Sequence, residues 1–486
     1  MIRSFSRLST RVSLPTASRA FSAEVETSWT DAWNAATENM KSNITFEESA
    51  EILRNLTKTD LLRATDLRDS PSRFFEAHRI LARHAVEHGP GFWIRFTVHY
   101  NLFAGTIVAA GDEEQVSRLA DYQAAGELGC FGLTEKLAGV QSGLVVQTTA
   151  TYDEASDEFI LDTPNEGARK NWISQGFVAD KAVVLADLIV KGESKGPHAF
   201  VMDFRSSGSL VPGVKIDDMG SKTVGNDLDN AWIDFENVRL PKDSMLRRYA
   251  EIVDGEYIIK GDVRPFDMIG QRLYTGRIAV AQAALEYRRA LFSKTKSYSD
   301  SKKMFAFSGE PVLSEIPQLE ALYEENEERL GRLDEYVGDC EAALSEVLKE
   351  GGTPDTRLVD CIATAKVKAV EDSIEMVHRL RQEVGSFALM ADAGFKHTDF
   401  LQCCKFAEGD SRILMSKIAR DRLRLVEKGQ DMDSEEGKQA LGLAMAMKGH
   451  LVKGASKQEA WDKEWKGVYE LAETVMDRVM TDGPTV

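Results

Sequence analysis

The sequence predicts an α+β protein with an N-terminal helical domain, a central antiparallel β domain and a C-terminal helical bundle. Residues 32–125 carry apolar side chains at helical spacing. Residues 128–240 hold short β-branched and aromatic runs punctuated by Gly and Asp, with no helical pattern between them, which disfavours a parallel βαβ sheet. Helical spacing returns from about residue 270. We expect domains at 24–126, 127–246 and 247–486, after a leader at 1–23.

Each part contains elements that can be placed from local patterns. In the first part, the break Gly89-Pro90-Gly91 separates two helical patterns. The second part has expected strands at 145–152, 159–161, 182–186, 198–202 and 231–235. The third part has expected helices at 273–295, 319–350, 357–384, 413–428 and 458–480. The bundle is therefore expected to carry extra helices near the end of the chain.

The first residues have the composition of an organelle transit peptide. Arg3, Arg7, Arg11 and Arg19 stand among many serines, and no acidic residue precedes Glu24. Mitochondrial and plastid import segments are rich in Arg and Ser and poor in acids. We expect a transit peptide at 1–23 and a mitochondrial location, with a plastid or a peroxisome as alternatives. A disordered tail is the other interpretation of this segment.

Charge and cysteine content disfavour several classes of protein. The formal net charge of the 486 residues is −18, and an acidic surface disfavours a nucleic-acid partner. The five cysteines show no metal-type spacing, which indicates a reduced compartment without a disulfide framework. No apolar run is long enough to span a bilayer. His84 and His88 lie one helical turn apart, but we interpret them as a helix surface and expect no metal site.

Several segments resemble one flavoprotein family. Residues 129–135, 148–153, 197–201 and 229–241 resemble the acyl-CoA oxidases, with the sequences GCFGLTE, TTATYD, PHAFV and DNAWIDFENVRLP. Residues 171–176, NWISQG, look more like the acyl-CoA dehydrogenases, which share the fold. The similarity runs from about residue 74 to 422. It implies an acyl-CoA dehydrogenase-like fold, bound FAD, and α,β-desaturation of a fatty acyl-CoA to the trans-2-enoyl-CoA, the first step of β-oxidation.

The resemblance assigns a general base. Glu408, in the segment FAEGD, matches the catalytic Glu of the family and would take the α proton while hydride leaves the β carbon. A carboxylate in an apolar pocket is a stronger base than in water. Gly409 would contact the substrate and Asp410 the cofactor. The other interpretation of Glu408 is a surface acid near a helix N-terminus, where the helix dipole favours it.

The resemblance also assigns residues to the flavin. Thr134, Trp172 and Ser174 match positions that contact the isoalloxazine ring, where hydrogen-bond donors stabilise negative charge on the reduced flavin. A core tryptophan is the other interpretation of Trp172.

Two segments match contacts to the FAD of a neighbouring subunit, which implies a homodimer or homotetramer. Gln382, Gly385 and Ser386 resemble the Gln-x-x-Gly-Gly turn of the family, with Ser386 in place of the second Gly. Lys302 and Phe305 stand where the family has Arg-x-x-Phe. Lysine keeps the charge of arginine but not its bidentate fork.

The sequence leaves the electron acceptor open between molecular oxygen and an electron-transfer flavoprotein. The sequences of most of these motifs resemble the oxidases, which favours an oxidase. The residues after Glu408 are too few for the second helical domain of peroxisomal oxidases, and the chain does not end in Ser-Lys-Leu, which favours a dehydrogenase. The alternatives are a flavoprotein of the same fold with another substrate, and a non-catalytic homologue with an assembly or binding role.

Overall fold

The computed structural model describes residues 29–37, 40, 44–139, 142, 145–261, 265–305 and 309–484, with side chains undescribed at 265–272. The predicted transit peptide at 1–23 lies outside the described residues. Contacts divide the chain into two compact units, residues 1–40 and 41–486. In the first unit, residues 29–37 are helical, and the rings of Trp29 and Trp33 pack edge to face with centroids 5.6 Å apart.

The second unit begins with the predicted helices. Local capping fixes two of them, because Thr45 with Glu48 and Asp112 with Gln115 each form a capping box that satisfies the first backbone N–H groups. The elements are α2 (Phe46–Thr57), α3 (Asp66–Asp69), α4 (Pro71–His88), α5 (Gly91–Thr97), the π-helix η1 (Val98–Ala104), α6 (Gly105–Ala110) and α7 (Glu113–Ala125).

Two sheets and two hairpins follow. The larger sheet has the order β1-β5-β2-β3-β11, with β6 also paired to β5, and comprises β1 (Gly129–Gly132), β2 (Thr149–Asp153), β3 (Glu158–Asp162), β5 (Lys181–Val190), β6 (Glu193–Asp203) and β11 (Val238–Pro241). The smaller sheet has the order β4-β10-β9, with β4 (Lys170–Ser174), β9 (Val214–Asp218) and β10 (Asn230–Phe235). The hairpins are β7 (Arg205–Ser206) with β8 (Ser209–Leu210), and β12 (Ala250–Val253) with β13 (Glu256–Ile259).

The strand pairing is antiparallel as expected, with two exceptions. β5 runs parallel to both β1 and β2. These parallel pairs arise without a crossover helix, because the chain between β1 and β5 forms three other strands instead. Alternating side chains of the sheets build a continuous apolar core that includes Phe159, Phe200 and Phe235.

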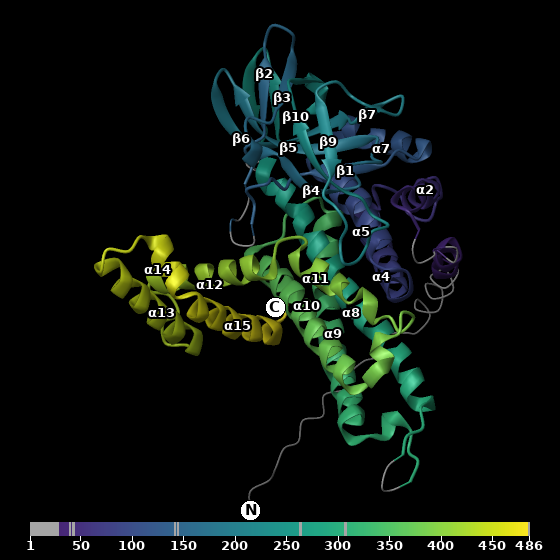
Figure 1. The fold of residues 1–486 in the computed structure, drawn as a ribbon. Helices are drawn as coiled ribbons and strands as arrows, with labels where there is room; N and C mark the ends of the chain where they lie inside the picture. The colour runs from purple at the N-terminus through teal and green to yellow at the C-terminus, as the bar shows by residue number, and fades with distance from the viewer. Residues whose placement is uncertain are drawn as a thin grey trace, which may run out of the picture. The chain divides into compact units, whose positions relative to one another are not determined.

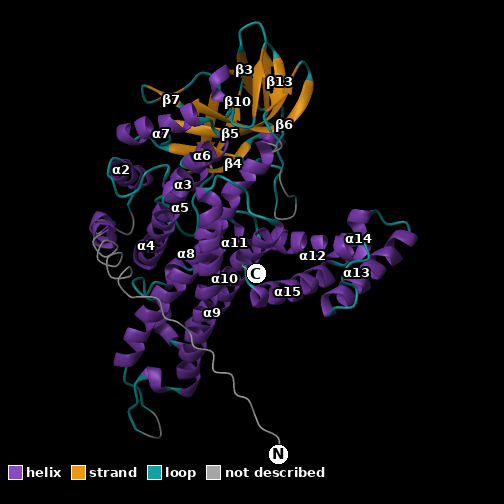
Figure 2. Cartoon of the chain, turned by 180° about the vertical axis from the view of Figure 1, so that it is seen from behind, coloured by secondary structure: helices purple, strands orange, loops and turns teal. Residues whose placement is uncertain are grey.

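The remaining chain is helical, as predicted. Its elements are α8 (Pro265–Ser301), α9 (Pro317–Lys349), α10 (Thr356–Glu383), α11 (Asp399–Phe406), α12 (Ser411–Glu427), α13 (Glu435–Val452), α14 (Lys457–Lys463) and α15 (Trp465–Asp482), with the short 3-10 turn η5 (Gly385–Leu389) after α10. Figure 1 shows α8, α9 and α10 side by side, with α12 to α15 gathered beside α10. Figure 2 shows the strands gathered near one end of α8.

The expected single helix at 458–480 is wrong in one respect. It is divided into α14 and α15 at Glu464, whose backbone, with φ −98° and ψ 19°, is not helical. α14 packs on α13, and α15 packs on α13 as well as on α12 and α10. The Glu464 carboxylate at the break meets the His450 ring of α13 at 2.7 Å. Within the described residues, no helix combines the length and apolarity that crossing a membrane requires.

Candidate active site

The predicted general base sits in a constrained turn between α11 and α12. Glu408 has φ 56° and Gly409 has φ 94°, so both lie in the left-handed region. For a residue other than Gly, such a conformation costs about 1–3 kcal/mol and clusters at functional sites. The next helix begins directly afterwards, because the Asp410 carboxylate caps it by accepting from the Arg412 N–H at 2.8 Å.

Two buried cations hold the backbone of this turn. Arg277 on α8 donates from Nε to the Glu408 carbonyl at 3.0 Å. Lys366 on α10, fully buried, donates to the carbonyls of Lys405 at 2.5 Å and Gly409 at 3.0 Å, and to the Ser411 hydroxyl at 3.1 Å. Burial lowers the pKa of Lys366 to about 7. The acceptors lie on both sides of Glu408, so the turn is fixed at each end.

The Glu408 carboxyl group lies between α8 and the π-helix η1. Asn101 donates from Nδ2 to Glu408 Oε1 at 3.4 Å, and its Oδ1 accepts from the Thr275 hydroxyl at 2.6 Å. The next residue on α8 is Gly276, where a Cβ atom would lie 2.3 Å from Glu408 Cδ. The glycine is therefore required by the close approach of the carboxyl group to the helix.

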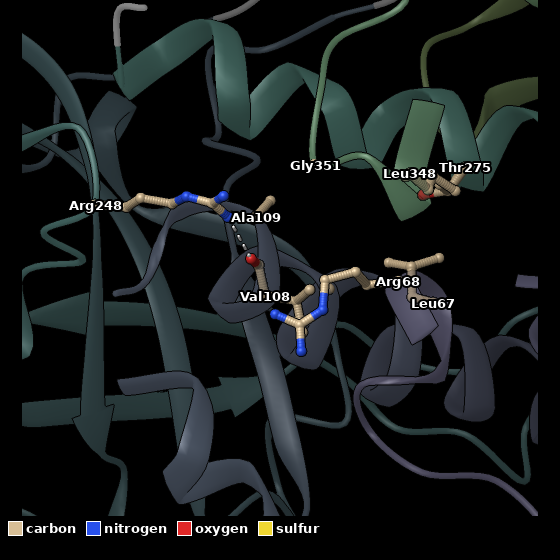
Figure 3. A pocket seen from close by; sticks show the side chains of 9 residues that line it. Leu67, Arg68, Val108, Ala109, Arg248, Thr275, Leu348 and Gly351 are labelled. Carbon is tan, nitrogen blue, oxygen red and sulfur yellow. Dashed lines mark hydrogen bonds between the residues drawn. The ribbon is translucent and has the colours of Figure 1, made fainter. Parts of the chain in front are cut away.

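A small cavity of about 20 Å³, enough for one water molecule, is lined by Thr275. Figure 3 shows Thr275 and Leu348 on one side of it and the guanidinium groups of Arg68 and Arg248 on the other. Arg248 donates to the carbonyl of Val108 at 3.5 Å. Thr275 thus both lines this cavity and contacts the residue that holds Glu408.

The predicted flavin residues come together on adjacent backbone segments. The Asn171 N–H donates to the Thr134 carbonyl at 2.9 Å, which joins the loop after β1 to β4. Trp172 has φ 58° and leaves 56% of its surface exposed, opposite a register shift between β4 and β10. This local irregularity turns the indole outward from the sheet. The Ser174 hydroxyl accepts from Asn230 Nδ2 at 3.0 Å, which fixes its position.

A buried ion pair supports the predicted flavin residues Thr134, Trp172 and Ser174, which we call the flavin platform. Lys170 and Glu135 are both fully buried and pair at 2.9 Å. Burial lowers the pKa of Lys170 to about 8, while Glu135 counteracts the shift. Glu135 also accepts from the N–H groups of Gln147 and Thr148. Because each polar group has partners, the pair fixes the strand that carries Trp172 and Ser174.

The other predicted cofactor residues lie elsewhere. Lys302 and Phe305 follow the end of α8, and Phe305 is 83% exposed. Gln382, Gly385 and Ser386 lie at the end of α10. The two helix ends are joined by stacked rings of Tyr298 and Phe387, 3.7 Å apart and nearly parallel. At 1.5 Å per helical residue, this end of α8 is roughly 40 Å from Gly276 and hence from Glu408.

The chain is similar to known acyl-CoA oxidases, although no family model matches it. Acyl-coenzyme A oxidase 2 of Yarrowia lipolytica is 30% identical over 361 residues, 68% of this chain and 50% of that protein. The peroxisomal acyl-coenzyme A oxidase 3 of Arabidopsis thaliana is 28% identical over 345 residues, 67% of this chain and 49% of that protein. Among solved structures, acyl-CoA oxidase-2 of Caenorhabditis elegans, bound with FAD, ascaroside-CoA and ATP, matches with a TM-score of 0.76 at 20% identity over 94% of this chain and 75% of that chain.

These similarities make the chain a relative of the acyl-CoA oxidases, with an acyl-CoA oxidase-like fold, and the predicted fold class is confirmed. The chain spans about half the length of the curated relatives it matches.

Sequence reasoning missed the residues that support Glu408. Two of them carried a usable signal: Asn101 and Lys366 are polar residues within apolar runs at helical spacing, and a buried polar group needs partners. The contacts of Thr275, Gly276 and Arg277 depend on tertiary structure and had no local signal.

Proposed function

We propose that this protein is an FAD-dependent enzyme that desaturates a fatty acyl-CoA to the trans-2-enoyl-CoA. The observation that carries the proposal is the placement of Glu408. In a chain related to acyl-CoA oxidases, this carboxylate occupies a strained turn, and its oxygen lies against a buried amide at 3.4 Å. A general base requires such positioning, because proton abstraction depends on the geometry of the base as much as on its strength.

The residues on the flavin platform fit an isoalloxazine ring. Thr134 and Trp172 are exposed on neighbouring segments, so a planar ring has an aromatic surface and polar groups to contact. FAD bound there supplies the acceptor for the β hydride. Ser174 accepts from Asn230 and thereby keeps its own hydroxyl hydrogen for another acceptor, such as a flavin nitrogen.

The proton step belongs to Glu408. Its carboxylate takes the α proton of the thioester, and the developing charge on the thioester oxygen requires hydrogen-bond donors. Arg277 and Lys366 fix the carbonyls of Glu408 and Gly409, and this sets the direction of the adjoining peptide planes. Asp410 serves as the cap of α12, so a cofactor contact by this residue would share its carboxylate with the helix.

We further propose a homodimer or homotetramer. Lys302 and Phe305 lie roughly 40 Å from Gly276 along α8, and Gln382 lies roughly 24 Å along α10 from Lys366, which contacts the Glu408 turn. Both segments are therefore too far from Glu408 to contact the flavin ring beside it. They converge at one end of the bundle through the stack of Tyr298 on Phe387. This arrangement fits contact with the FAD of a neighbouring subunit.

Molecular oxygen is the favoured acceptor in this proposal, because the curated relatives are oxidases; an electron-transfer flavoprotein is the alternative. The compartment is an organelle. The Arg-rich segment at 1–23 favours the mitochondrion. The relatives do not support a mitochondrial location. The Arabidopsis relative, which is named as peroxisomal, supports the peroxisome.

Glu408→Gln tests the proposal. The amide keeps the size of the side chain but cannot take a proton, so we expect normal FAD content and at least about a 100-fold slower flavin reduction by acyl-CoA. Glu427→Gln, an exposed position at the end of α12, is the matched control and should behave as the wild type. Substantial reduction by Glu408→Gln would remove Glu408 as the base.

A further inference from the structure

Asn101 is an unusual residue for its position. It is fully buried on the π-helix η1, which also carries His99 and Tyr100. π-helical turns are rare in proteins, and those that occur are often found at functional sites. A buried amide must satisfy both its donor and its acceptor. Asn101 does so with two residues far apart in the sequence, Thr275 and Glu408.

The order of these hydrogen bonds fixes the orientation of the amide. The Thr275 hydroxyl donates to Asn101 Oδ1 at 2.6 Å, so this end of the amide is the acceptor. The opposite end, Nδ2, therefore faces Glu408 Oε1. A reversed amide would place two oxygens together at Glu408, which is unfavourable. The carboxylate, which only accepts, thus favours Nδ2 on its side, and Thr275 supplies the donor for the opposite end of Asn101.

The carboxyl group is restricted on a second side by α8. Gly276 follows Thr275 directly, and its missing side chain leaves the space that Glu408 occupies. Two adjacent residues of α8 therefore contribute to this site: Gly276 leaves space for the carboxyl group, and Thr275 donates a hydrogen bond to the amide that contacts it. A hydrogen bond donated to a carboxylate favours the ionised form. The charged groups nearest this carboxyl group are Arg277 on α8 and Lys366 on α10, which donate to the Glu408 and Gly409 carbonyls.

We propose that Thr275 and Asn101 form a hydrogen-bond relay that positions the Glu408 carboxylate and keeps it ionised before the substrate is deprotonated. Both are positioning residues that act through Glu408. This inference rests on the proposed role of Glu408 as the base and goes beyond it by assigning control of its ionisation.

The relay is tested by the pH dependence of flavin reduction. Thr275→Val keeps the shape of the side chain but removes the hydroxyl, and Asn101→Leu removes the amide. In Asn101→Leu we expect the acid limb of the rate profile to shift upward by about one pH unit, because a hydrogen bond to a charged group contributes roughly that much. Thr275→Val removes only the bond that supports Asn101, so we expect a smaller upward shift. Thr275→Ser retains a hydroxyl and should restore the wild-type limb.

Thr295→Val is the matched control. Thr295 is also a buried threonine of α8, and its hydroxyl donates to the Leu291 carbonyl at 2.7 Å, far from Glu408. This variant should leave the acid limb unchanged. Equal limbs for wild type, Thr275→Val and Asn101→Leu would overturn the relay, as would the same shift in Thr295→Val.

A second measurement is independent of turnover. Infrared difference spectra between wild type and Glu408→Gln isolate the carboxyl band of Glu408, which can be followed against pH without substrate. We expect the midpoint of this band to move upward by about one unit in Asn101→Leu and by less in Thr275→Val. An unmoved midpoint would contradict the relay, even if the protein fails to oxidise any acyl-CoA.

Discussion

The position of the Glu408 carboxyl group depends on Gly276, a residue that has no side chain. The carboxyl group occupies the position of the absent Gly276 side chain, 2.3 Å from where a Cβ atom would stand. The atoms that such a Cβ atom would meet belong to the end of the flexible Glu408 side chain and not to backbone, so an added methyl group would move the carboxyl group and leave the helix intact.

Gly276→Ala is therefore expected to separate stability from activity. Alanine in a helix interior is favoured over glycine by up to about 1 kcal/mol, so the free energy of unfolding should stay equal or rise. Flavin reduction should slow by about 100-fold, because a displacement near 1 Å costs about that much. Gly331→Ala on α9, where a Cβ atom meets open space, is the control. Unchanged reduction in Gly276→Ala would show that the carboxyl group is placed elsewhere during turnover.

Single residues were the least predictable part of the site. The segment around Glu408 was identified by resemblance, but nothing local indicated that Asn101 would meet it, since the two are separated by most of the chain. Trp172 was expected beside the flavin; its left-handed backbone follows from the register shift in the sheet and has no sequence signal.

At the scale of elements, α10 stabilises the turn between α11 and α12 through the hydrogen bonds that Lys366 donates. Its ammonium group donates to three acceptors around Glu408, without a carboxylate in direct contact. Arg277 on α8 lowers the pKa of Lys366 further, after burial, while Asp410 on the turn, Cys404 on α11 and Glu371 on its own helix oppose the shift.

This lowered pKa predicts a pH-dependent stability. The folded protein releases the Lys366 proton above about pH 7, whereas the unfolded chain holds it to about pH 10. The unfolded state then binds more protons, so the contribution of Lys366 to the free energy of unfolding rises with pH across that window, by about 1.4 kcal/mol per unit.

Lys366→Met removes this contribution. Denaturant unfolding at pH 7 and pH 9 should show the wild type gaining about 2 kcal/mol relative to the variant. Lys368→Met is the control, because Lys368 on the same helix pairs with Glu473 and Asp477, and these partners raise its pKa. A constant difference between wild type and Lys366→Met at both pH values would contradict a buried, easily deprotonated lysine.

Elements were predicted well where periodicity is long. α8, α9, α10 and α12 were all expected from apolar spacing, and their bounds agree within a few residues except at both ends of α8. The break at Glu464 was missed because α14 and α15 have one continuous apolar pattern, and the non-helical backbone of Glu464 has no sequence signal. The parallel pairs of β5 were missed because pairing direction is a tertiary property.

At the scale of the whole molecule, the expected α–β–α order is present and places the flavin platform and Glu408 within one compact unit. The chain spans about half the length of its curated relatives. A complete flavin site is expected to need two subunits, because Lys302 and Phe305 stand at the far end of α8 from the base.

The most direct test of the account is anaerobic mixing of the purified protein with a panel of saturated acyl-CoA thioesters, followed at the flavin absorption band. We expect a yellow protein whose band bleaches as the trans-2-enoyl-CoA forms, and fast recovery of the band when oxygen is admitted if the enzyme is an oxidase. Slow recovery would assign the dehydrogenase alternative. A protein without flavin, or a flavin that no acyl-CoA bleaches, would contradict the proposed desaturation.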